Sequence, residues 1–375
     1  MTTSPPTELP PARVAWRRPG GRRRGALAAA AVAAAATLGA CGGPHHVAGG
    51  TGPGSTTAPG PASQPAKPKA HHAILAPLTG QPVSAGRARR EAVVVKIDNI
   101  APALPQTGVA QADVVYEEMV EGGLTRLAAV FQSTYPKVVG PVRSGRLTDE
   151  GIVDDLDHPV LAYAGANGLF QPKLAAQPAH LVDADNYPSL FYRDDAREAP
   201  HNLYADAFRL AATVRRPVAP RPLWSFRAAG APFTAAGARP AAGVTVTFPA
   251  ATARWTWSAA HFRWLRTQDG LPDVDSSGAR LSAANVVVEM VPYHTSAYVS
   301  GEGAASGGAI PTGDLVGSGR AWILSGGKVV EGRWHRASLT GPTVYEDAAG
   351  RPVRLAPGPT WVELPPVGSA VAVSR

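Results

Sequence analysis

The sequence predicts two unlike folded parts behind an unstructured N-terminal segment: an α/β or α+β N-terminal domain and a mostly-β C-terminal domain. Three observations carry this prediction. Residues 42–70 are rich in Pro, Gly, Ala, Ser and Thr and lack hydrophobic periodicity. Residues 92–214 mix apolar β-rich runs with helical stretches, and after residue 224 short β-type runs recur between turns. A chain of 375 residues is long enough for two domains. We therefore expect a signal peptide at 1–40, a lipid-anchored disordered tether at 41–73, a mixed α/β domain at 74–215, a linker at 216–223 and a β-rich domain at 224–375.

The N-terminus has the composition of a secretory signal. Six arginines and one glutamate lie in residues 1–40, so this segment carries five of the eight net positive charges of the chain. An Arg-Arg-Arg run at 22–24 precedes an alanine-rich run from Ala26 to Ala40, which is shorter than the ~20 residues that span a membrane. Because no dense Lys/Arg run remains in the folded part, we expect no nucleic-acid partner.

Cys41 is the only cysteine, which excludes an intrachain disulfide. The ending Leu38-Gly39-Ala40-Cys41 resembles the lipobox of bacterial lipoproteins, whose cysteine thiol receives a diacylglyceryl group. This resemblance implies that acylated Cys41 anchors the chain in membrane lipid, on the extracytoplasmic face of the cell membrane. The alternative is an uncleaved alanine-rich anchor with an incidental cysteine.

The N-terminal domain begins with a buried strand at 92–97, a continuous apolar run with one lysine. Strands at 113–120 and 125–132 flank a hairpin-like turn, Glu121-Gly122-Gly123. A helix is expected at 147–156, another strand at 159–164, and helical pieces near 170–176 and 204–214.

Several segments together resemble a known family. They are VVVKIDN, PQTG, QADVVYEEMVEGGLTRLAAVFQS, VGPVRSGR, APHNLY, GRAWILSGGKVVEGRWHR and PGPTWVELPP. They resemble the YerB-like lipoproteins, whose domains are called domain of unknown function 3048. The resemblance implies an envelope lipoprotein with an N-terminal and a C-terminal domain, and it supplies no reaction. Its recurring polar positions map onto Asp98, Asn99, Gln106, Asp113, Glu117, Arg126, Arg143, Ser144, Arg146, His201 and Asn202.

The arginines among these positions suggest an anion site. Arg143, Ser144 and Arg146 lie just before the predicted helix, and guanidinium groups with free helix N–H groups suit phosphate or carboxylate. With Arg126 they define a candidate site for a cell-wall polymer, a lipid phosphate or an envelope protein. The structural alternative is that these arginines pair with Asp113 and Glu117 inside the sheet. We expect Ser144 to cap the helix.

A catalytic reading is the weaker hypothesis. Asp98, Asp113 and Glu117 could supply a carboxylate pair for hydrolysis of envelope glycans, which requires two carboxylates about 5–10 Å apart in an open cleft. A third hypothesis is a purely structural scaffold. We favour a binding module over an enzyme, assign no catalytic residue, and expect neither cofactor nor metal. The acidic run from Asp154 to Asp157 is interpreted as a solvated helix end.

The C-terminal domain is expected to be a barrel or sandwich of short strands, with runs at 244–248, 253–258, 262–265, 285–291, 321–324, 328–335, 353–355 and 361–364. Its tryptophans could form a carbohydrate platform, but their alternation with polar residues favours a core. Residues 273–278 begin like a calcium loop, yet Ala284 stands where the glutamate ligand belongs, so we expect a turn. A Gly/Ser/Ala-rich loop is expected at 294–312.

Overall fold

A computed structural model describes residues 73–166, 170–296 and 310–375. The predicted signal peptide, Cys41, nearly all of the tether and most of the predicted loop at 294–312 lie outside the described residues. The described residues belong to one compact unit.

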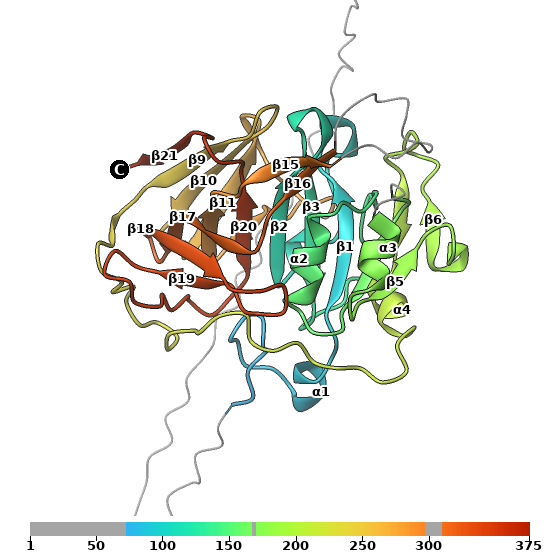
Figure 1. The fold of residues 1–375 in the computed structure, drawn as a ribbon, viewed down its shortest axis with the longest axis horizontal. Helices are drawn as coiled ribbons and strands as arrows, with labels where there is room; N and C mark the ends of the chain where they lie inside the picture. The colour runs from blue at the N-terminus through green and yellow to red at the C-terminus, as the bar shows by residue number, and fades with distance from the viewer. Residues whose placement is uncertain (1–72, 167–169, 297–309) are drawn as a thin grey trace, which may run out of the picture. The chain divides into compact units, whose positions relative to one another are not determined.

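An eleven-stranded mixed sheet runs through both halves of this unit (Figure 1). Its strand order is β19-β18-β17-β14-β20-β2-β3-β1-β4-β5, and β8 pairs with β18. The halves meet where β2 and β20 pair in parallel, from Val114 opposite Thr360 to Glu118 opposite Leu364. The predicted linker at 216–223 therefore connects two parts that share one sheet. The strands are β1 (Val93–Asp98), β2 (Val114–Met119), β3 (Thr125–Phe131), β4 (Val160–Tyr163), β5 (His180–Asp183), β8 (Arg239–Pro240), β14 (Asn285–Glu289), β17 (Gly317–Ser325), β18 (Lys328–Arg336), β19 (Val344–Glu346) and β20 (Thr360–Leu364).

A second, six-stranded antiparallel sheet belongs to the C-terminal half. It consists of β9 (Gly243–Thr247), β10 (Thr252–Ser258), β11 (Arg263–Gln268), β12 (Leu271–Pro272), β13 (Ser282–Ala283) and β21 (Val371–Ser374). Two antiparallel pairs complete the strands: β6 (Phe191–Arg193) with β7 (Leu203–Ala205), and β15 (Tyr293–Ser296) with β16 (Ile310–Gly313).

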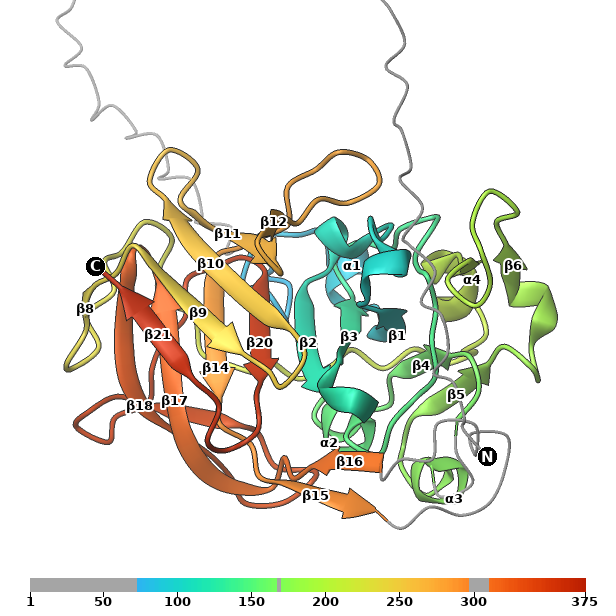
Figure 2. The same cartoon turned by 90° about the horizontal axis from the view of Figure 1, so that it is seen from above.

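The large sheet has a hydrophobic core on each face. One core contains Val95 and Ile97 of β1, Leu210, and Trp255 and Trp264 of the second sheet. The other contains Val94 of β1, Ile152 and Phe170. Figure 2 shows α2 and α3 on one side of the strands and α4 on the other. The helices are α1 (Ala85–Ala88), α2 (Asp149–Asp154), α3 (Phe170–Ala175) and α4 (Ala207–Ala211), with 3₁₀ turns η1 (Ala101–Ala103), η2 (Val109–Gln111), η3 (Glu121–Gly123) and η4 (Pro188–Leu190).

The predicted fold class is confirmed: the N-terminal half mixes strands and helices, and the C-terminal half is mostly β. The last predicted helix of the N-terminal half is shorter than expected. Leu203–Ala205 is strand β7, and α4 starts only after Asp206, whose carboxylate accepts a hydrogen bond from the N–H of Phe208 at 2.8 Å. The predicted strand at 353–355 contributes only an isolated bridge, between Leu355 and Phe226.

The tryptophans lie mainly in the core, as the alternation predicted. Trp255, Trp264 and Trp334 are fully buried, and Trp322 and Trp361 are nearly so. Trp257 is the partly exposed exception on β10.

Candidate functional site

The candidate site lies where parallel strands β1, β4 and β5 reach their carboxyl ends. The segment 139–145 passes this edge: Val142 forms a bridge with Ile97, and the N–H of Arg143 donates to the carbonyl of Lys96 at 2.9 Å. On its other side, the carbonyl of Arg143 accepts from the N–H of Ala164 at 3.0 Å, just after β4. Ligands of open α/β sheets bind at this kind of edge.

Three arginines gather here, and we call Arg126, Arg143 and Arg146 the arginine cluster. Arg143 Nε lies 3.0 Å from Asp98 Oδ2, and the same oxygen is 2.7 Å from His201 Nδ1. Arg146 binds the carboxylate of Glu121 through Nη2 at 2.7 Å and Nε at 3.0 Å. Two of the three arginines of the cluster are therefore paired with carboxylates.

The third arginine of the cluster, Arg126, is buried, with a relative exposure of 7%. Its Nη1 donates to the carbonyl of Ser144 at 3.0 Å, and its Nε has no hydrogen-bond partner. Within the described part of the chain, Arg126 has no ion pair. Burial, together with the positive charges of Arg146 and Arg143, lowers its pKa to about 10. At neutral pH it is still a cation, so the cluster holds three positive charges against the carboxylates of Asp98 and Glu121.

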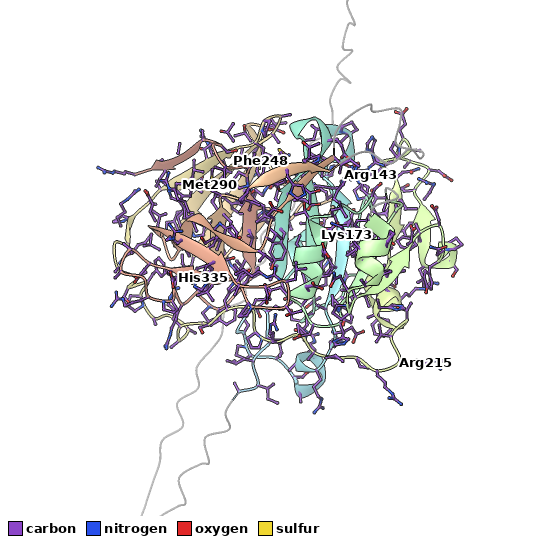
Figure 3. The ribbon with its side chains drawn as sticks, viewed as in Figure 1. Arg143, Lys173, Arg215, Phe248, Met290 and His335 are labelled. Atoms are coloured by element: carbon purple, nitrogen blue, oxygen red, sulfur yellow. The ribbon has the colours of Figure 1, made fainter. Side chains whose placement is uncertain are left out.

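A pocket of about 410 Å³ opens beside the cluster, and Arg143 lines it. Figure 3 labels Arg143. The lining of the pocket includes Gly165 and Asp185, each two residues after the end of β4 or β5, and Arg193 supplies a second cation. Arg193 is held by Asn202, whose Oδ1 accepts from Arg193 Nη1 at 2.7 Å. We call this the N-terminal pocket; its remaining lining residues are Val142, Ala164, Ala184, Pro188, Phe191, Tyr192, Pro200 and Leu203.

Three of the predicted polar residues, Asn99, Gln106 and Glu117, form a separate network on the opposite face of the sheet. Asn99 Nδ2 donates to Glu117 at 3.0 Å, and Asn99 Oδ1 accepts from Gln106 at 2.8 Å. Glu117 also bonds to Arg266 of β11 at 2.5 Å. Arg266 is fully buried and lies 4.7 Å from the centre of the Trp361 ring. This closed network fixes the second sheet to the first.

Residues 78–218 match the "Protein of unknown function (DUF3048) N-terminal domain", and residues 244–362 match the corresponding C-terminal domain. The chain belongs to the DUF3048 family. "Putative lipoprotein YerB" of Bacillus subtilis (strain 168) is 25% identical over 314 residues, which cover 80% of this chain and 89% of that protein.

The fold of this family member is also that of a solved structure. The crystal structure of YerB from Bacillus subtilis superposes with a TM-score of 0.67 at 24% identity, covering 80% of this chain and 99% of that one. The similarity to a putative lipoprotein supports a membrane-anchored envelope protein. No helix of the described residues is long and apolar enough to cross a membrane.

The alternative that the arginine cluster pairs with Asp113 and Glu117 is wrong. Asp113 lies at the start of β2, away from the cluster, and accepts hydrogen bonds from Gln132 N–H and from Ser133. Glu117 binds Arg266 instead. The sequence could not show this, because Arg266 lies 149 residues further along the chain.

The predicted N-cap role of Ser144 is also wrong. α2 starts at Asp149, and the Asp149 carboxylate accepts from the N–H of Arg146 at 2.8 Å. Ser144 contributes its carbonyl to Arg126. Because α2 has only six residues, its N-terminus adds little to an anion site, and the arginine side chains carry the charge.

The acidic run after α2 is not solvated as predicted. Asp154 and Asp155 are buried, and Asp155 Oδ1 accepts from Arg221 at 3.2 Å. Burial and the nearby Glu150 raise the pKa of Asp154 to about 6.

The segment that begins like a calcium loop forms the expected turn at residues 275–278, and Asp273 before the turn binds Arg266. Within the described segments, no group of three or more acidic, His or Cys side chains could hold a metal ion.

The carboxylates do not form the open pair that glycan hydrolysis requires. Asp98 is bound by Arg143, and Glu117 by Arg266. Glu117 and Glu363 are neighbours across β2 and β20, but both are buried. This arrangement disfavours the glycan-hydrolase hypothesis.

Sequence reasoning missed Glu121 and Arg193 at the candidate site. It also missed three residues of the buried network, which are Arg266, Gln268 and Glu363. One signal was available for Arg266. It alternates with Trp264 and Gln268 along β11, and all three face inward. A charged residue in the inward register of a strand is costly unless it is paired, so a buried partner is expected.

Proposed function

We propose that this chain is a lipid-anchored envelope protein whose N-terminal half binds an anionic group, a phosphate or a carboxylate, at the arginine cluster and the N-terminal pocket. One observation carries the proposal: buried Arg126 has no carboxylate partner among the described residues, although it lies beside two more arginines. A buried cation without a partner is costly, and an anionic ligand would offset that cost.

The pocket supports this proposal over a purely structural role. Arg143 is the member of the cluster that lines the pocket, and about a quarter of its side chain is exposed. A ligand in the pocket would meet Arg143 and Arg193 from two sides, and guanidinium groups bind phosphate and carboxylate in a bidentate manner. Acylation of Cys41 would place this pocket on the extracytoplasmic face, where cell-wall polymers, lipid phosphates and envelope proteins supply such anions.

Binding of glycerol 3-phosphate to the full chain, measured by isothermal titration calorimetry, tests the proposal. We expect Arg143→Gln to weaken binding by about 10- to 100-fold, because a charge-assisted hydrogen bond contributes about 1.5–3 kcal/mol. Arg215→Gln is the matched control: Arg215 is exposed and lies far from Arg143 (Figure 3). Circular dichroism checks that both variants are folded. Equal binding by the wild type and Arg143→Gln, or equal losses in both variants, would refute the anion site.

A further inference from the structure

A second cavity, of about 530 Å³, lies in the C-terminal half and has no place in the function proposed above. Three parts of the chain build it: Gln81 and Pro82, the segment from Arg227 to Phe233, and the hairpin of β10 and β11. The hairpin contributes Trp257 of β10, His261 and Phe262 of the turn, and Arg263 of β11. Ala284, Gly326, Ala356 and Pro357 close it. We call it the C-terminal cavity. Its volume is in the range of small-molecule sites, about 300–1,000 Å³.

The charge of this cavity is positive and unbalanced. Arg227 and Arg263 both line it, and no Asp or Glu does. Arg227 donates only to neutral acceptors, which are the carbonyls of Ala231 at 2.9 Å and Arg354 at 3.3 Å and the hydroxyl of Ser325 at 2.9 Å. The side chain of Arg263 has no hydrogen bond or ion pair within the described ranges, although it is only partly exposed. Burial lowers the pKa of both guanidinium groups, and no nearby carboxylate offsets this effect.

The cavity also has an aromatic wall. Phe262 is 76% exposed, more than any other large hydrophobic side chain in the described segments. Its backbone has φ +50°, a left-handed conformation that is unusual for a bulky residue. The turn thus holds the ring outward at a conformational cost, and strain of this kind is concentrated at functional sites. The Trp257 ring lies beside it, with centroids 6.4 Å apart and planes at 82°.

We propose that the C-terminal cavity binds an acidic saccharide, a sugar ring that bears a phosphate or a carboxylate. The aromatic rings offer flat apolar surfaces to the C–H face of the sugar, while Arg227 and Arg263 take the anionic group. Neither part alone explains the cavity: an apolar ligand would leave the two cations unpaired, and a small inorganic anion would leave Phe262 without a contact. A flat membrane surface fits less well, because the arginines line a concave site.

Binding to the full chain, measured by calorimetry with four probes, tests this proposal. The probes are glucose 1-phosphate, glucuronate, neutral glucose and inorganic phosphate. We expect both acidic sugars to bind at least tenfold more tightly than glucose or phosphate. Arg263→Gln should remove the advantage over glucose, and Phe262→Ala should remove the advantage over inorganic phosphate. Arg254→Gln is the matched control, because Arg254 lies on the exposed side of β10 and outside the cavity.

Hydrogen exchange separates this site from the arginine cluster. All calorimetry is repeated in Arg143→Gln, and mass spectrometry follows amide protection at 226–233 and 257–263 after addition of glucose 1-phosphate. Protection there that persists in Arg143→Gln supports the C-terminal cavity even if the N-terminal anion site fails. Protection only at 142–146, or an unchanged protection profile in Arg263→Gln, would overturn the proposal.

Discussion

Asp98 and Arg126 lie opposite each other on the antiparallel strands β1 and β3, yet they do not form an ion pair. The carboxylate of Asp98 instead binds Arg143 and His201, which arrive from later parts of the chain. Arg126 donates a hydrogen bond to the carbonyl of Ser144 instead. This exchange of partners creates the excess positive charge on which the proposed anion site rests.

Replacing Asp98 tests how much its bonds to Arg143 and His201 contribute to stability and to anion binding. Asp98→Asn removes a charge that bonds to both Arg143 and His201, so we expect the free energy of unfolding to fall by about 1–3 kcal/mol. Binding of glycerol 3-phosphate should tighten, because the cluster loses one of its two carboxylates. Urea unfolding followed by circular dichroism, together with calorimetry, measures both effects. Asp195→Asn, at an exposed position, should change stability by no more than about 0.5 kcal/mol. Weaker phosphate binding by Asp98→Asn would contradict the charge argument.

The sequence predicted the strands of this region better than their partners. The hairpin of β2 and β3 follows from local alternation and a Gly-Gly turn, and both are local properties of the chain. The pairing of β2 with β20 is not local, since it joins Val115 to Trp361. The polar residues that the sequence singled out do not form one group in the structure. Their division between two faces depended on residues far along the chain, such as Arg266, that only the folded sheet brings close.

Arg266 is expected to be the most sensitive position of the buried network. It binds Glu117 and Asp273, and it lies near Glu363, all inside the protein. Arg266→Met leaves these carboxylates uncompensated, so we expect a loss of about 3–5 kcal/mol in the free energy of unfolding. Chemical denaturation measures the loss. Arg239→Met, at a surface ion pair with Glu331, should cost less than about 1 kcal/mol. Similar losses of unfolding free energy in Arg266→Met and Arg239→Met would show that burial does not decide how much an ion pair contributes to stability.

Glu363 should tolerate loss of its charge. Burial, reinforced by the charge of neighbouring Glu117, raises its pKa well above the usual range, which favours the protonated form of the side chain. Its Oε1 accepts from Trp255 Nε1 at 2.7 Å, and a glutamine can keep this acceptor. We expect Glu363→Gln to change stability by less than about 1 kcal/mol, whereas Glu363→Ala leaves a cavity and costs about 2 kcal/mol or more. Thermal and urea unfolding of the two variants separates charge from packing, and a large loss in Glu363→Gln would refute the protonated state.

Glu289 makes stability depend on pH. Burial raises its pKa from 4.5 to about 7, although a hydrogen bond from the Tyr345 hydroxyl at 2.6 Å opposes the rise. Between these two values the folded chain keeps a proton that the unfolded chain releases. The free energy of unfolding therefore falls as the pH rises from about 4.5 to about 7. Glu289→Gln stays neutral throughout, so its decline should be shallower by up to about 3 kcal/mol.

Urea unfolding at pH 5 and at pH 7.5 measures that difference in slope. Glu331→Gln is the control, because Glu331 is exposed and should leave the slope of the wild type unchanged. Parallel pH profiles for the wild type and Glu289→Gln would show that Glu289 titrates normally in the folded chain.

Gly145 links the packing of the large sheet to the arginine cluster. It lies between Ser144 and Arg146, and a Cβ atom built there would lie 2.0 Å from Cζ of buried Phe170. Because that ring packs edge-on against Tyr163 in the core, the backbone at 144–146 must give way in Gly145→Ala. We expect a loss of about 1–3 kcal/mol in the free energy of unfolding and weaker binding of glycerol 3-phosphate, since Arg126 bonds to the carbonyl of Ser144.

The matched substitution is Gly86→Ala in α1, where a Cβ atom would meet nothing within 4 Å. It should leave anion binding unchanged and leave stability equal or raise it by about 0.4–1 kcal/mol. The two alanine variants together separate the general effect of replacing glycine from the clash with Phe170. If Gly145→Ala unfolds like the wild type, the ring has room to move, and the position of Arg126 does not depend on this contact.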